Sequence, residues 1–355
     1  MRVPDKVLFV HQGALGDFLL AWPALWAVAG WARGGMEAER GMEKGEGIGG
    51  GTFCSGKTLR SGEYEKKPFL LSAYEQKVPP PNPLLPKTLL RFVGDKQRMI
   101  WLEPLGVRFR EPETAREIDR LYGREKWPES LEDTLLVWPG LQKRPPVPEH
   151  DNVWFLPGFA RGRRVSPRDL YLEELQGRGV PVHGDYVQAF RALFAAGREP
   201  GRTVLLFPGA GHPRKAWPLV KYLELAARLS AAGLEPLFVL GPAEVEQGMD
   251  VPGTACVRPE SLAALQALIL RAAAVVGGDT GPLHLAAMLG VPMLSLFGPT
   301  DPAVWAPYGA RILAAADACA PCAGLAADID CGHGRCLTEL AVDAVWAALV
   351  ETYAG

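Results

Sequence analysis

The chain has 355 residues, of which 48% are hydrophobic, and a formal net charge of −2 at neutral pH. This length and apolar content predict a globular protein with two domains of ordinary size and exclude a disordered or fibrous chain. Six cysteines are too few for a disulfide scaffold, no apolar run reaches membrane-spanning length, and MRVPDKVLFV lacks the regions of a signal peptide. We therefore expect a cytoplasmic protein.

The charge is divided unevenly along the chain. Residues 1–199 contain 29 Lys and Arg against 26 Asp and Glu, whereas residues 200–355 contain 9 against 14. A positive first half would suit an anionic acceptor or an anionic lipid surface. An excess of this size is also what ordinary solubility produces, so both interpretations stay open.

The first predicted element is a buried strand at residues 6–11, followed by a turn at 12–17 and an apolar helix at 18–28. The turn occupies the position of a dinucleotide-binding fingerprint, but its G-x-x-G-D pattern lacks the G-x-G-x-x-G spacing. This departure argues against a nicotinamide enzyme. Asp17 stands at the start of the helix, where a carboxylate also complements the helix dipole.

Residues 34–87 differ in character from the rest of the chain. The run GGMEAERGMEKGEGIGGG has no apolar period, and VPPPNPLLP is proline-rich, so we expect a disordered insertion. Residues 51–58 (GTFCSGKT) fit the P-loop expression. A P-loop follows an apolar strand and opens a helix, and this stretch does neither, so we assign it no nucleotide.

Strand and helix signals resume at residue 88, with TLLRFV at 88–93 and LLVW at 135–138. A basic loop, RGRRVSPR, then carries four arginines: Arg161, Arg163, Arg164 and Arg168. These side chains could meet phosphate groups on an acceptor, or the loop could simply be solvated.

A second α/β domain is predicted after the hinge-like segment EPGR at 199–202. Its first strand, at 203–207, runs into the glycine-rich turn PGAGHPRKAWP and a helix at 219–229. Lys215, with Arg214 beside it, could contact a diphosphate there, although a solvated turn lysine is the alternative. A strand at 237–240 follows, after which Glu244 or Glu246 could accept hydrogen bonds from ribose hydroxyls.

The stretch AVVGGDTGPLHLAAMLGVPMLSLF predicts a strand, a tight turn, a helix and another strand. Pro282 is tolerated in the first turn of the helix, and Gly290 suits its end. The turn, formed by Asp279, Thr280 and Gly281, therefore lies at the carboxyl end of a strand, where backbone N–H groups and the helix dipole favour an anion such as phosphate. His284, one turn into the helix, either shares this site or is a core histidine.

Four cysteines lie close together near the end of the chain, as Cys319, Cys322, Cys331 and Cys336. This C-x2-C-x8-C-x4-C spacing could hold a structural zinc ion. A disulfide or redox role and plain thiols remain alternatives.

The string DTGPLHLAAMLGVP at 279–292, followed by LFGPTDP at 296–302, resembles the signature of glycosyltransferase family nine, the ADP-heptose:lipopolysaccharide heptosyltransferases. The resemblance is dense from about residue 202 onward, returns at 7–28 and is weak between them. It implies an α/β fold of GT-B type, with two Rossmann-like domains whose parallel sheets face each other across a cleft. The implied domains are residues 1–198, on the acceptor side, and 199–336, on the nucleotide-sugar side. A helix at 337–355 would pack back toward the first domain.

The same resemblance implies the chemistry. The aspartate of the family's G-D pair, here Asp17, is its proposed catalytic base, and the lysine of the second-domain turn, here Lys215, contacts the diphosphate. We expect the remaining ADP-sugar contacts from Glu244, Asp279, Thr280, Gly281 and His284. Asp17 would deprotonate an acceptor hydroxyl for in-line attack, which inverts the anomeric carbon.

The expected donor is therefore an ADP-sugar and the expected acceptor a lipopolysaccharide core or lipid-linked glycan, with peripheral contact at the inner membrane and no nucleic acid. No D-x-D motif lies in either site turn, so Lys215, backbone amides and the helix dipole would neutralise the phosphates without an obligatory metal cofactor. A nucleotide-sugar epimerase or hydrolase on the same fold, and a non-catalytic nucleotide-binding protein, are the alternatives.

Overall fold

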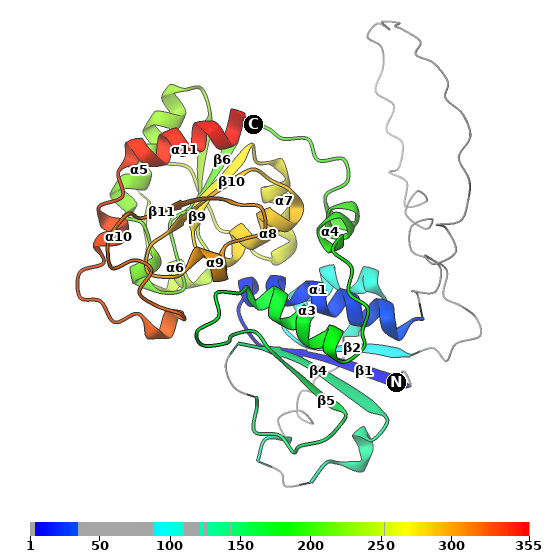
Figure 1. Ribbon diagram of the computed structural model, residues 1–355. Helices are drawn as coiled ribbons and strands as arrows, with labels where there is room; N and C mark the ends of the chain where they lie inside the picture. The colour runs from blue at the N-terminus through cyan, green and yellow to red at the C-terminus, as the bar shows by residue number, and fades with distance from the viewer. Residues whose placement is uncertain are drawn as a thin grey trace, which may run out of the picture.

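The computed structural model describes residues 4–34, 88–109, 121–123, 126–141, 144–251 and 253–354. The predicted insertion at 34–87, with the P-loop-like stretch at 51–58, lies outside the described residues except for Gly34. Within them, the strands form two sheets, both entirely parallel (Figure 1).

The first sheet has the strand order β3-β2-β1-β4-β5. Its strands are β1 (Lys6–His11), β2 (Leu89–Gly94), β3 (Arg108–Phe109), β4 (Thr134–Gly140) and β5 (Val153–Pro157). The helical segments of this half are α1 (Leu15–Ala32), η3 (Lys96–Trp101), η4 (Glu103–Leu105), η5 (Glu129–Leu131), α3 (Pro167–Gly177) and α4 (Tyr186–Phe194).

The second sheet has the order β11-β10-β9-β6-β7-β8. Its strands are β6 (Thr203–Phe207), β7 (Glu235–Val239), β8 (Cys256–Val257), β9 (Ala274–Gly278), β10 (Met293–Phe297) and β11 (Arg311–Ala314). Its helical segments are η6 (Pro213–Lys215), α5 (Leu219–Ala231), α6 (Pro242–Glu246), α7 (Leu262–Arg271), α8 (Gly281–Leu289), α9 (Pro302–Trp305), η7 (Ala326–Asp328), α10 (Arg335–Thr338) and α11 (Val342–Ala354).

Helix α1 is apolar on nearly every side because it is covered on several faces. It packs against the first sheet, against α3 and against α8 of the second domain, and Phe18 and Trp22 are fully buried. By length and composition alone α1 could cross a membrane, but 67% of it is buried inside the protein. This burial is that of a core helix.

One buried apolar cluster extends from the first sheet through α1 and α8 into the second sheet. It includes Phe9 of β1, Trp22 of α1, Leu285 of α8 and Leu205 of β6. Helix α4 adds to this junction, because it contacts both α1 and α8. The two sheets are therefore joined by packed helices, and the residues at the ends of α1 and α8 are held in fixed positions.

The C-terminal helix differs from the prediction. The helix predicted at 337–355 is two segments, α10 and α11, and α11 packs on the second domain, against α5, β9, β10 and β11 (Figure 1). Its buried residues Val345 and Leu349 share a core with Val204 and Leu294. The expected packing toward the first domain was wrong, because the apolar face of α11 covers the sheet nearest to it in the sequence.

Candidate active site between the two domains

The predicted site residues follow the carboxyl ends of parallel strands, in the turns or in the first turns of the helices, near the points where the strand order reverses. In the first sheet β1 lies between β2 and β4, and in the second β6 lies between β7 and β9. Parallel α/β sheets bind ligands at such switch points. After β1, Asp17 lies in the first turn of α1; after β6, Lys215 ends η6; and after β9, Asp279 lies in the turn before α8.

The first turns of α1 and α8 touch across the domain junction. A Cβ atom added at Gly281 would lie 2.9 Å from Leu15 Cβ and 3.0 Å from Gly16 N, so only glycine allows this approach. The positive ends of two helix dipoles therefore meet here, which favours an anion beside them. Thr280 is the N-cap residue of α8 and is half-buried.

Lys215 and Asp279 form a buried ion pair. Lys215 Nζ lies 2.6 Å from Asp279 Oδ2, and the side chains are only 12% and 9% exposed. Thr300 Oγ1 also donates a hydrogen bond of 3.0 Å to Asp279 Oδ2. The backbone of Lys215 crosses the end of β9, where a Cβ at Gly278 would lie 2.8 Å from the Lys215 carbonyl oxygen. The loop after β6 is therefore held over the turn after β9.

Asp17 faces these residues from the first domain. Burial raises the pKa of its carboxyl group above the ordinary value, and the negative charge of Asp279 adds to that rise. The hydrogen bond from Ala14 N–H (3.2 Å) and the charges of Lys215 and Arg98 act in the opposite direction. A carboxylate whose pKa is raised by burial becomes a better proton acceptor while it remains ionised.

His284 belongs to the same group of residues. Its side chain is buried, and a Cβ at Gly16 would lie 3.4 Å from His284 Cδ2. Burial and the charges of Lys215 and Arg168 lower its pKa to about 4, although Asp279 opposes this shift. The imidazole is therefore neutral at physiological pH, and its role here is to pack or to exchange hydrogen bonds without carrying charge.

Glu244 and Glu246 differ in their surroundings. Glu244 Oε2 accepts a hydrogen bond of 2.8 Å from Gly241 N, and its other oxygen lies so close to Gly209 that a Cβ there would be only 1.8 Å away. Glu244 therefore faces the loop that carries Lys215, whereas Glu246 is exposed. Of the two glutamates, Glu244 is the one held beside this loop.

The side chain of Arg214 has a different partner from that of Lys215. Its Nη2 donates a hydrogen bond of 3.0 Å to the carbonyl oxygen of Gly332, in the cysteine-containing loop. Arg214 is thus bonded to that loop, whereas Lys215 pairs with Asp279.

Of the four arginines predicted in one loop, Arg168 lies in α3, and three of the four are paired with carboxylates. Arg163 pairs with Glu173, Arg168 with Asp169, and Arg164 with Asp301 of the second domain. Phe159 also stacks on Trp305, and Arg168 lies over the Tyr308 ring. The loop thus ties the two domains together instead of presenting four free cations.

A cavity of about 460 Å³ opens beside this loop, lined among others by Phe159, Leu170, Glu174 and Arg178. Arg178 pairs with Glu174 at 2.6 Å, so the charges of the lining offset one another. None of the predicted donor-site residues lines this cavity.

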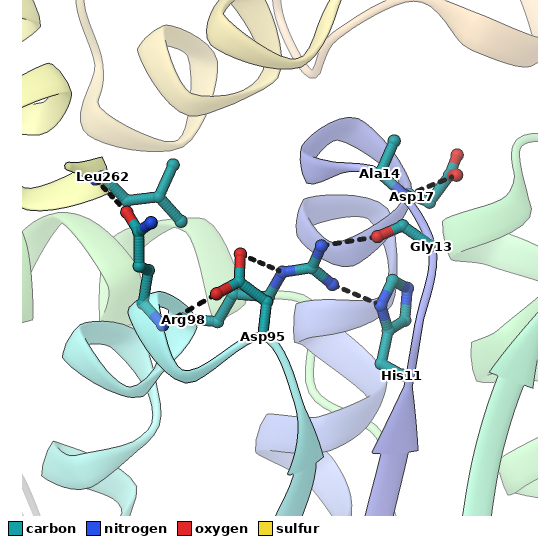
Figure 2. Close-up of polar contacts among 8 residues, drawn as sticks. His11, Gly13, Ala14, Asp17, Asp95, Arg98 and Leu262 are labelled. Carbon is teal, nitrogen blue, oxygen red and sulfur yellow. Dashed lines mark hydrogen bonds and ion pairs between the residues drawn. The ribbon is translucent and has the colours of Figure 1, made fainter. Parts of the chain in front are cut away.

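Sequence reasoning missed two buried polar residues beside Asp17. His11, the last residue of β1, and Arg98, in η3, are 3% and 6% exposed, and Arg98 Nη1 lies 2.6 Å from His11 Nδ1 (Figure 2). No local pattern marks Arg98, because its hydrogen-bond partners, His11 and Gly13, are more than eighty residues away in the sequence. His11 could have been noticed as a polar residue at the end of a buried strand.

The cysteine quartet forms no metal site in the part of the chain that the structure describes, where no group of three or more His, Cys, Asp or Glu residues is arranged to hold an ion. Cys319, Cys322, Cys331 and Cys336 are free thiols, so the disulfide alternative is not realised. A hydrogen bond with Asp317 raises the pKa of Cys319, and burial raises that of Cys336. Thiols with raised pKa values are poor nucleophiles at neutral pH.

Two parallel-sheet α/β domains whose strand ends converge on one junction define the GT-B class of glycosyltransferase folds. The structure is similar to Escherichia coli heptosyltransferase WaaC with ADP, with a TM-score of 0.55 and 17% identity over 98% of this chain and 99% of that one. It is also similar to the iron-containing dodecameric glycosyltransferase TibC from enterotoxigenic E. coli H10407, with a TM-score of 0.57 and 14% identity over 100% of this chain and 77% of that one.

The amino-acid sequence also matches known proteins over part of its length. Residues 185–327 match glycosyltransferase family 9 (heptosyltransferase), and lipopolysaccharide heptosyltransferase 1 of Pseudomonas aeruginosa is 38% identical over 163 residues, 44% of this chain and 45% of that protein. This part of the chain is therefore similar to glycosyltransferase family 9. The sequence match spans about half the length of this curated relative.

Proposed function

We propose that the protein is an inverting glycosyltransferase that moves a heptose, or a related sugar, from an ADP-sugar to a hydroxyl group of a lipopolysaccharide core or related acceptor. The observation that carries the proposal is the meeting of a carboxylate from one domain with a lysine and a helix N-terminus from the other. Asp17 comes from the first turn of α1, whereas Lys215 ends η6 and Gly281 begins α8, in the second domain.

The second domain would hold the donor. Lys215 keeps two N–H donors besides the one directed at Asp279, and they can reach a diphosphate beside the amides that open α8. Glu244 and Thr280 would complete the nucleotide side, and His284 would support the turn as a neutral group. A cation, oriented backbone amides and a helix dipole stabilise the charge that develops on the departing ADP.

Asp17 would act on the acceptor. As a carboxylate it would take the proton of the acceptor hydroxyl while the oxygen forms its bond to the anomeric carbon and the bond from that carbon to ADP breaks. Because attack and departure occur on opposite faces, the configuration of the anomeric carbon inverts. The charge of Lys215 acts on Asp17. This agrees with a site in which the base, Asp17, and the departing ADP, held by Lys215, lie beside the same anomeric carbon.

The P. aeruginosa relative is named a lipopolysaccharide heptosyltransferase, which supports the acceptor class. The similar E. coli structure is of a heptosyltransferase with ADP, which supports the donor class. A lipid-anchored acceptor would bring the protein to the cytoplasmic face of the inner membrane as a peripheral enzyme. We include no metal in the reaction, and the cysteine quartet in the second domain would be at most structural.

The test is to incubate purified protein with ADP-heptose and a heptose-deficient lipopolysaccharide core, and to follow ADP release and the mass of the acceptor. Transfer with inverted anomeric configuration, read by NMR, is expected. The donor alone provides the control, since a new sugar or free heptose without acceptor would identify the epimerase or hydrolase alternative. ADP binding without any turnover would identify a non-catalytic nucleotide-binding protein.

A further inference from the structure

Arg98 contacts the turn that carries Asp17. It lies in η3, directly after β2, and its side chain reaches the carboxyl end of β1 (Figure 2). Nη1 donates to His11 Nδ1 at 2.6 Å, and Nη2 donates to the carbonyl oxygen of Gly13 at 2.5 Å. Charge-assisted hydrogen bonds are among the stronger ones in proteins.

The carbonyl that Arg98 holds belongs to the same peptide group that holds Asp17. The Gly13 carbonyl and the Ala14 N–H are the two ends of one peptide unit, and Ala14 N–H donates to Asp17 Oδ2 at 3.2 Å. A peptide unit is planar, so fixing the direction of its oxygen fixes the direction of its N–H. A charged donor on the oxygen also polarises the unit and strengthens the bond that its N–H makes.

We propose that Arg98 is a positioning residue of the transfer reaction, which orients the Gly13–Ala14 peptide and through it the carboxylate of Asp17. The proposal rests on the proposed function for the role of Asp17 as base. It adds a residue from a segment that the family match, at 185–327, does not reach.

Arg98 is placed to act through the peptide and not on substrate. The residue is 6% exposed, its guanidinium lies 5.1 Å from the centre of the Phe18 ring, and its Nε is buried without a hydrogen-bond partner. The carboxylate of Asp95 is 3.9 Å from that Nε, too far for a hydrogen bond. Both polar ends of the guanidinium are thus committed to β1 and its turn.

His11 serves as the second anchor of the guanidinium. Burial and the charge of Arg98 lower the pKa of His11 to about 3, so the ring is neutral. An arginine only donates, and Nδ1 must therefore accept its hydrogen bond. A Cβ at Gly13 would lie 3.0 Å from His11 Cε1 and 3.1 Å from Asp17 Oδ2, so the turn is packed between the ring and the carboxylate.

The segment that carries Arg98 is itself fixed from the second domain. Gln97 Oε1 accepts a hydrogen bond of 2.9 Å from Leu262 N, at the start of α7, and Trp101 Nε1 donates one of 2.6 Å to Gln266 Oε1. Residues on both sides of Arg98 are therefore tied to the domain that would bind the donor. A positioning residue needs such a rigid support.

The charge of Arg98 also acts on the pKa of Asp17, so the pH dependence of kcat/KM is a second way to test the proposal. Asp17 faces Asp279, Lys215 and Arg98, and its charge is also felt by the buried hydroxyl of Tyr171 on α3. Of these, Arg98 and Lys215 favour the ionised carboxylate. Removing Arg98 therefore shifts the pKa of Asp17 further upward, and the acid limb of kcat/KM moves to higher pH with it.

The experiment compares Arg98→Met, Arg98→Lys and a control, Arg33→Met. Arg33 is also partly buried and donates to a backbone carbonyl, that of Leu105, but it lies at the other end of α1. We expect Arg98→Met to lower kcat roughly tenfold or more while ADP affinity changes by less than about twofold, and to move the acid limb upward. Arg98→Lys should restore the limb and only part of kcat, whereas Arg33→Met should do neither.

Hydrogen exchange of the amides at residues 12–18, measured without substrate, separates this proposal from the proposed function. Faster exchange in Arg98→Met than in Arg33→Met is expected even if the sugar is not a heptose. If the wild type transfers no sugar, the proposed function fails and the exchange rates alone decide the role of Arg98. Equal exchange and equal kcat in the two variants would overturn the proposal. If Arg98→Met does not fold, the amide exchange and kcat of Arg98→Lys, without the pH limb, are compared with those of Arg33→Met, and equal values in these two variants overturn the proposal.

Discussion

Lys215 and Asp279 form an ion pair between the segments that follow β6 and β9 of the second sheet, with Nζ 2.6 Å from Oδ2 and the side chains 12% and 9% exposed. A buried pair of this kind holds the loops in register, and breaking it by removing one partner leaves an uncompensated charge. The pair also leaves Lys215 beside the start of α8, where we propose that the diphosphate binds.

Lys215→Ala should therefore weaken ADP binding. The lost charge-assisted hydrogen bond corresponds to about 1.5–3 kcal/mol, or roughly 10–150-fold in Kd, measured by calorimetry. Arg214→Ala is the matched control, because Arg214 donates to the Gly332 carbonyl, and it should leave Kd within about twofold. Equal losses in the two variants would mean that the diphosphate site is misplaced.

Asp17→Asn separates chemistry from binding. Asparagine keeps the size and can accept the Ala14 N–H bond, but it cannot take a proton from the acceptor. Transfer should fall roughly 100-fold or more while ADP affinity is retained. Transfer at a rate near that of the wild type would rule out Asp17 as the base.

The stability of the protein should report the raised pKa of Asp17. Burial raises the pKa of Asp17 in the folded state above its value in the unfolded state, so the folded state binds the proton more tightly. The stability that this proton binding contributes is fully present below the unfolded-state pKa. It is lost as pH rises through the folded pKa. Asp17→Asn should therefore raise Tm at pH 7 by about 2 °C or more, and this gain should vanish in acid. A gain that is independent of pH would argue against a buried charge.

The strand and turn pattern allowed much of the second domain to be predicted. The helix opened by Pro282 and ended by Gly290 is α8, and Gly290 has the positive φ of 74° that favours glycine at a helix end. The fold class was also correct, because parallel strands buried on both faces read as continuous apolar runs. These features depend on residues close together in the sequence.

The remaining features depend on contacts between distant residues. Arg98 meets His11 across 87 positions, and Trp101 meets Gln266 across 165, and neither pairing leaves a local signal. The amphipathic pattern of α11 predicted a buried face but could not tell which sheet would cover it. Likewise, four arginines in one loop suggested an anion site, yet Arg164 reaches Asp301 of the other domain.

The approach of α1 to α8 gives the last prediction, since it depends on one missing methyl group. A Cβ at Gly281 would lie 2.9 Å from Leu15 Cβ and 3.0 Å from Gly16 N, so Gly281→Ala must push the two helix ends apart. We expect a loss of about 1–3 kcal/mol in unfolding free energy and weaker ADP binding, because the opening amides of α8 move.

Gly16→Ala tests the same junction from the other side, where the atom nearest to the added Cβ is 3.4 Å away, and it should lower the unfolding free energy much less. Gly30→Ala, with no atom within 4 Å of the added Cβ, should stabilise α1 by up to about 1 kcal/mol. Denaturant unfolding and ADP calorimetry on the three variants decide the matter, and a Gly281→Ala variant as stable and as tightly binding as Gly16→Ala would show that the helix ends do not need this close contact.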